Sequence, residues 1–138
     1  PLVNTFIVKK LRKMTPDDPK SYMLPRLLKD SEDMEFAKEL LAKTLLRNSE
    51  FEGEIVDKTP NWDKDRIAEI DAILLKMAIC ELLHFSSIPE RVTLNEYLEI
   101  ATEYSTPKSS IFINGVLDKL VREYKADGKL KKTGRGLL

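Results

Sequence analysis

The chain of 138 residues contains few of the side chains from which most enzyme sites are built. It has one cysteine, Cys80, and one histidine, His84. A single cysteine excludes a disulfide within the chain and favours a reducing, cytoplasmic setting. A single histidine leaves no basis for a cysteine–histidine nucleophile pair or for a histidine metal cluster. We therefore predict a protein that is not an enzyme and that has no metal or cofactor.

Long apolar runs are also missing. The longest apolar stretch, from Ala72 to Leu83, is interrupted by Lys76 and Glu81 and falls short of the roughly eighteen residues that a membrane span needs. The sequence therefore predicts a soluble protein without a membrane partner. A chain of this length can bury roughly two-thirds of its unfolded surface as one domain, so we expect residues 1–138 to form a single domain.

The formal net charge is zero, from 23 basic and 23 acidic residues, but the charge is unevenly distributed. Residues 1–13 have a net charge of +4, residues 125–138 also +4, and residues 14–124 a net charge of −8. The bases of the first segment are Lys9, Lys10, Arg12 and Lys13. An acidic body with basic ends can bind a nucleic acid at its ends and present acids to a basic protein. Solvated tails on an ordinary acidic domain explain the pattern equally well.

The spacing of apolar residues predicts an all-α fold of about six helices without strands. The central helix, Asp65 to Phe85, carries apolar side chains on every face, so it should lie in the core. Ser31 is expected to cap one helix, and capping boxes beginning at Ser49 and Thr93 start two others. The predicted helices cover residues 1–14, 31–48, 49 to the turn at Thr59–Asn61, 65–85, 93–104 and 107–124.

The pair Asn114–Gly115 is usually typical of a hairpin turn. Apolar residues recur around it at intervals of three and four, from Phe112 to Tyr124, which favours a helix. A glycine inside a helix costs about 1 kcal/mol relative to alanine. We therefore expect another backbone to pack closely against Gly115.

A candidate site for a polynucleotide lies at the start of this last helix. Free backbone amides at a helix N-terminus attract phosphate, and Lys108, Ser109 and Ser110 add donors. Phe112, one turn later, can stack on a base. The alternative is that both serines serve only the helix start and that Phe112 is a core residue. The residues alone leave both interpretations open.

Several motifs in the second half of the chain carry a family resemblance. They are the segment Arg66 to Leu83, Pro89-Glu90-Arg91-Val92, Asn95-Glu96, Ile100-Ala101 and Phe112-Ile113-Asn114-Gly115-Val116-Leu117-Asp118. In order and spacing they resemble the C-terminal half of the NusB transcription antitermination factors. The resemblance covers about Met34 to Leu120.

The resemblance implies a small all-helical fold of two packed three-helix bundles. It also implies a function: binding of single-stranded boxA-type leader RNA of ribosomal RNA operons, together with the ribosomal protein NusE, in the transcription elongation complex. In this family the segment matching Lys108, Ser109, Ser110 and Phe112 touches RNA. The positions matching Asp71 and Glu81 lie on the side that faces NusE.

The N-terminal segment departs from the family pattern. An arginine-rich helix begins the family's fold, whereas residues 1–14 are atypical and offer only Lys9, Lys10, Arg12 and Lys13 for RNA. The chain also starts at Pro1, so we expect either a longer N-terminal region in the native protein or weak RNA binding. Residues 125–138 are expected to form a basic flexible tail.

Two other functions fit the same residues. Ribosomal RNA cytosine methyltransferases use a NusB-like accessory domain that binds RNA, and this reading requires a further C-terminal domain. A protein-interaction module without RNA contact fits the neutral overall charge.

Overall fold

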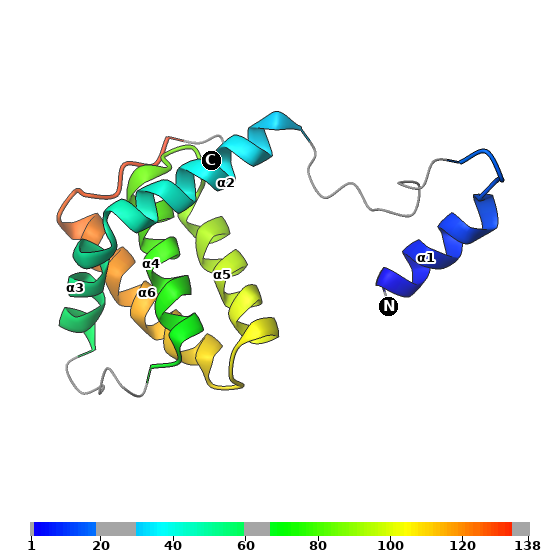
Figure 1. The fold of residues 1–138 in the computed structure, drawn as a ribbon. Coiled ribbons are helices and arrows are strands. Elements are labelled where there is room, and N and C mark those ends of the chain that lie inside the picture. Colours follow the sequence, from blue (N-terminus) through cyan, green and yellow to red (C-terminus); the bar gives the residue numbers. More distant parts are fainter. Residues whose placement is uncertain (1, 19–29, 60–66, 134–138) are drawn as a thin grey trace. The chain divides into compact units, whose positions relative to one another are not determined.

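The structure, a computed structural model, describes residues 2–18, 30–59 and 67–133. These residues contain six α-helices and no strand, which confirms the predicted all-α class (Figure 1). The chain divides into two compact units, Pro1–Glu35 and Phe36–Leu138. The arrangement as two three-helix bundles stays a prediction. The helices are α1 (Leu2–Lys13), α2 (Ser31–Leu46), α3 (Asn48–Lys58), α4 (Glu69–His84), α5 (Glu90–Tyr104) and α6 (Ser109–Ala126).

Helix α4 lies at the centre of the second unit and packs against α3, α5 and α6 (Figure 1). Leu75, Ala78 and Ile79 have no exposed surface, so the predicted core position of this helix is confirmed. Cys80 is equally buried, and burial raises the pKa of its thiol, as expected for an unreactive core cysteine. Each fully buried large apolar side chain contributes about 1.5–3 kcal/mol to folding.

Helix α2 covers this core only in part. Its Leu40 is buried, and the ring of Phe36 packs edge-on against Phe85 with 5.3 Å between ring centroids. Leu41 and Leu45 are exposed and, with Ile73 of α4, line an open apolar groove of about 380 Å³.

The helix ends differ from the prediction because backbone bonds and neighbouring side chains replace the expected caps. Helix α4 begins at Glu69, four residues after the predicted Asp65, which lies outside the described residues. The side chain of Asp30, and not Ser31, caps α2 by accepting hydrogen bonds from the amides of Glu32 and Asp33 at 3.0 and 3.3 Å.

Neither predicted capping box forms. Only Arg47 separates α2 from α3, and the amide of Phe51 donates a hydrogen bond to the carbonyl of Arg47 at 3.0 Å. Ser49 therefore lies within the helical backbone hydrogen bonds and not at the N-cap position. Helix α5 begins at Glu90 after Pro89, and the amide of Thr93 donates to the Pro89 carbonyl at 3.2 Å. The hydroxyl of Thr93 is thereby left for a tertiary contact.

Gly115 lies within α6, which confirms the helix, but the close backbone contact predicted there is wrong. The residue is exposed, and a β-carbon added to it meets no atom within 4 Å. The glycine therefore weakens the helix without a packing reason.

We expect Gly115→Ala to raise the free energy of unfolding by about 0.5–1 kcal/mol, since alanine restricts the unfolded backbone and fits the available space. Urea unfolding with an unchanged m-value is the measurement. Gly128→Ala is the control, because Gly128 has a φ of 65°, where a side chain is strained, and should destabilise the protein. A loss of stability in Gly115→Ala would show that the site is not open.

Candidate functional site

The start of α6 presents one basic side chain to solvent. Lys108 is exposed at the N-cap position and is followed by a first helical turn without an acidic residue. A helix N-terminus carries a partial positive charge, and a lysine next to it adds to the field that attracts phosphate. Ile111, which the sequence analysis did not single out, is 76% exposed beside it.

The other predicted RNA contacts at this site are less accessible. Ser110 is half-buried, and Phe112 is half-buried and packs against the hydrophobic core. Ser109 is 2% exposed, so its side chain faces the interior. Of the four predicted residues, the structure therefore leaves Lys108 exposed and Ser110 and Phe112 partly exposed.

A buried hydroxyl network connects this helix start to α4. Asp71 Oδ1 accepts a hydrogen bond from the Ser105 hydroxyl at 2.5 Å, and Asp71 Oδ2 accepts one from the Ser109 hydroxyl at 2.7 Å. The Ser109 oxygen also accepts a bond from the Thr106 amide at 3.2 Å and lies 2.8 Å from the Thr106 hydroxyl. The carboxylate thereby fixes the loop that carries Lys108.

Ser105 and Thr106 were not predicted as members of this network. The available signal was indirect: an acid within an otherwise apolar helix must find donors when it is buried. Ser105 and Thr106, between two predicted helices, and Ser109, at the start of the second of these helices, offer hydroxyl groups, but nothing in their spacing assigns them to Asp71.

Asp71 and Glu81, which the resemblance places on the side that faces NusE, are both buried. They are 4% and 6% exposed, and Glu81 accepts hydrogen bonds from the hydroxyls of Thr93 at 2.7 Å and Tyr97 at 3.2 Å. Burial and the negative charge of Glu81 raise the pKa of Tyr97. Both carboxylates are occupied by donors from other helices, so they face the interior of the unit.

The bases of α1 lie in the first unit. Lys9, Arg12 and Lys13 are exposed, and Lys10 Nζ lies 5.7 Å from the centroid of the Phe6 ring. Phe6 and the three lysines line a hollow of about 310 Å³. Proteins commonly combine an aromatic ring with cationic side chains to bind single-stranded nucleic acids.

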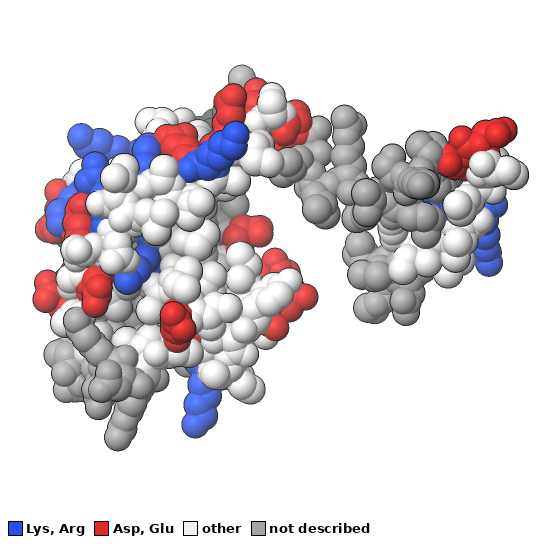
Figure 2. Space-filling model, in the orientation of Figure 1, with Lys and Arg blue, Asp and Glu red and all other residues white. Residues whose placement is uncertain are grey.

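The described residues offer little for other chemistry. They contain no group of three or more histidine, cysteine or acidic side chains placed to hold a metal. None of the helices in residues 2–18, 30–59 and 67–133 combines the length and the apolar character of a membrane span. On the face drawn in Figure 2, acidic and basic side chains are interspersed over the second unit.

Comparison with known proteins decides the family. The sequence model of the NusB family matches residues 5–122. The chain belongs to the NusB family. This result confirms the family resemblance, and the transcription antitermination proteins of this family are not enzymes, as predicted for this chain.

Individual NusB proteins are similar over most of this chain. The transcription antitermination protein NusB of Salinibacter ruber is 44% identical over 110 residues, covering 79% of this chain and 68% of that protein. That of Chloroherpeton thalassium is 38% identical over 109 residues, and the chain spans about half of its length, 52%. A solved structure of T. maritima NusB has a TM-score of 0.65 and 27% identity, covering 88% of this chain and 86% of that one.

Proposed function

We propose that this NusB family member is a transcription antitermination factor that binds single-stranded, boxA-type leader RNA together with the ribosomal protein NusE in the elongation complex. The observation that carries the proposal is the family match over residues 5–122, joined by antitermination proteins at 38–44% identity. The exposed Lys108 at an acid-free helix start supports an RNA contact.

The basic side chains of α1 supply a second RNA contact in this proposal. Lys9, Lys10, Arg12 and Lys13 sit on one helix with Phe6, so phosphate contacts and base stacking can occur together. At the α6 start, Lys108 and Ser110 bind phosphate, whereas Ser109 and Phe112 shape the site through the hydroxyl network and the core.

We expect Lys108→Glu to reduce the affinity for a boxA-type RNA about tenfold at low salt, because it converts a phosphate contact into a repulsion. The salt dependence should become shallower by roughly one unit in the logarithmic slope. Fluorescence anisotropy of a labelled RNA, with and without NusE and at two salt concentrations, measures both.

Lys119→Glu is the matched control, since Lys119 is exposed on the same helix and the change in charge is identical. It should change the affinity far less. Equal losses in both variants would assign the effect to overall charge and not to the start of α6. Failure of the unmodified chain to bind the RNA even with NusE present would overturn the proposed function.

A further inference from the structure

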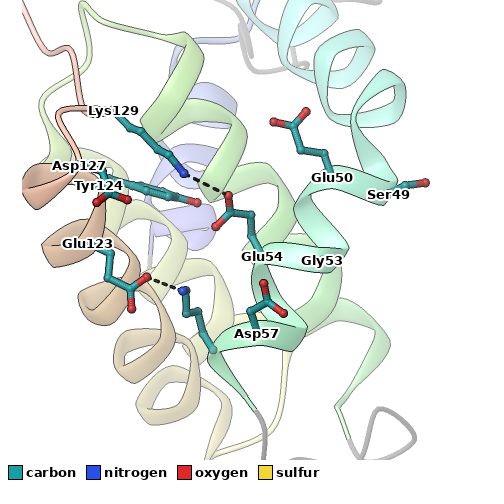
Figure 3. Close-up of a pocket in the computed structure, with 10 residues that line it drawn as sticks. Ser49, Glu50, Gly53, Glu54, Asp57, Glu123, Tyr124, Asp127 and Lys129 are labelled. Atoms are coloured by element: carbon teal, nitrogen blue, oxygen red, sulfur yellow. Dashed lines mark ion pairs between the residues drawn. The ribbon is translucent and has the colours of Figure 1, made fainter.

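A second polar surface, the acidic cleft, lies between α3 and the end of α6, apart from the α6 start that carries Lys108 (Figure 3). It has a volume of about 430 Å³ and contains five carboxylates and two ammonium groups among its lining residues, a net charge of −3. Its charged residues are Glu50, Glu54, Asp57, Lys58, Glu123, Asp127 and Lys129. This negative charge repels phosphate, so the cleft suits a cationic ligand and not RNA.

A buried tyrosine that lacks a hydrogen-bond partner forms part of this cleft. Tyr124 is 1% exposed, and its hydroxyl makes no hydrogen bond with any of the described residues. In Figure 3 the hydroxyl end points toward Glu54, whose charge, after burial, raises the pKa of Tyr124, although the geometry between the two groups does not make a hydrogen bond. Buried hydroxyls are nearly always paired, so this one has capacity for a ligand.

The cleft already holds a cation loosely. Lys129 Nζ lies 3.9 Å from Glu54 Oε1 and 5.7 Å from the centroid of the Tyr124 ring, and its side chain is 53% exposed. Such an exposed, distant ion pair contributes little, so another cation can displace it. Lys58 is different: it is bound to Glu123, its side chain is 19% exposed, and the hydrogen bond to Glu123 raises its pKa.

We propose that the acidic cleft binds an arginine side chain of a basic protein partner, and that Lys129 occupies part of the arginine position in the free chain. A guanidinium group carries five donors in a plane, so it can donate to Glu54 and to the Tyr124 oxygen together, which the single ammonium of Lys129 does not do. The proposal rests on the proposed function only in that the partner is a basic protein; it is independent of RNA binding.

Binding of a fluorescein-labelled nonapeptide of alternating arginine and glycine to the full chain tests the proposal. Glu54→Gln should weaken binding about tenfold, whereas Lys129→Gln should tighten it severalfold because it removes the internal competitor. A peptide with glutamine in place of arginine should not bind.

Two control variants separate the cleft from overall charge. Lys125→Gln removes a positive charge from the last turn of α6, four residues before Lys129, but Lys125 pairs with Glu90 at 2.6 Å. Glu99→Gln removes an exposed acid of α5. Both should leave the affinity within about twofold. Equal tightening by Lys129→Gln and Lys125→Gln, or equal weakening by Glu54→Gln and Glu99→Gln, would overturn the proposal.

Tyr124→Phe provides a second variant that does not depend on charge. It should weaken peptide binding severalfold and leave the urea midpoint unchanged or higher, because the hydroxyl has no partner to lose. Unchanged peptide binding by this variant would overturn the role of the hydroxyl in the cleft.

The partner of the proposed function is tested separately with NusE. Binding of the arginine peptide at the cleft without binding of NusE supports the inference and overturns NusE as the partner. Binding of NusE with the same affinity by the unmodified chain and by Glu54→Gln overturns the inference and leaves the proposed function standing.

Discussion

Replacing Asp71 by alanine is expected to lower the free energy of unfolding by about 3 kcal/mol. The change removes two short hydrogen bonds to a carboxylate, each worth about 1.5–3 kcal/mol, while the lost desolvation penalty of the charge offsets part of the effect. The buried hydroxyl of Ser109 then keeps only Ser105 and Thr106 as partners. Urea unfolding at constant m-value measures the loss.

Glu99→Ala serves as the control for Asp71→Ala. Glu99 is exposed on α5, so its removal should change stability by less than about 0.5 kcal/mol. Asp71→Asn keeps the shape of the side chain, so its loss in free energy of unfolding should lie between those of Asp71→Ala and Glu99→Ala. A loss below about 1 kcal/mol in Asp71→Ala would contradict the idea that this carboxylate holds α4, α5 and α6 together.

The same network connects stability with the proposed RNA contact. Asp71 fixes Ser105 and Ser109, and Lys108 lies in the loop between them. Asp71→Asn should therefore weaken RNA binding under conditions where the variant remains folded. The effect should not add fully to that of Lys108→Glu, because both changes act on one loop.

Glu81→Ala is expected to have a similar effect, again about 3 kcal/mol. It leaves the hydroxyls of Thr93 and Tyr97, which are 0% and 3% exposed, without their acceptor and opens a cavity between α4 and α5. Glu81→Gln retains the shape of the side chain and should lower the free energy of unfolding by less than Glu81→Ala does. Because the charge of Glu81 contributes to the raised pKa of Tyr97, that pKa should move toward its ordinary value in both variants.

A double-mutant cycle of Glu81→Gln with Tyr97→Phe measures the pairwise contact. The two residues are in direct hydrogen-bond contact at 3.2 Å, so their effects on stability should be coupled by more than about 0.5 kcal/mol. Additive effects would contradict the hydrogen bond as a contributor to stability.

The outcome for these two acids shows where the sequence analysis reached its limit. The apolar pattern predicted that the central helix is buried, and Leu75, Ala78 and Ile79 confirm it. The same pattern places Asp71 and Glu81 in that helix without showing which neighbours pair with them. Their place on the side that faces NusE was implied by the family resemblance, whereas the structure pairs both buried carboxylates with hydroxyl donors from α5, α6 and the loop between them.

The starts of α3 and α5 were also placed wrongly from local sequence motifs. Ser49 and Thr93 have the residue types of capping boxes, but α3 and α5 begin earlier, where backbone bonds to Arg47 and Pro89 replace side-chain caps. The hydroxyl of Thr93 then bonds to Glu81, twelve residues earlier in the chain. A local motif competes with tertiary contacts, and here those contacts prevail.

The sequence by itself determined the helical class, the buried central helix and the helix across Asn114–Gly115, because helical hydrogen bonds and apolar spacing are local properties. It also indicated the family, through motifs whose order and spacing resemble those of NusB proteins. Only the tertiary structure decided which polar groups are buried and which are free to bind a partner. Asp71 meets its donors 34 and 38 residues away, and Tyr124 reaches the acidic cleft only when α6 packs against α3. Such pairings depend on the folded arrangement of helices, which no single stretch of sequence encodes.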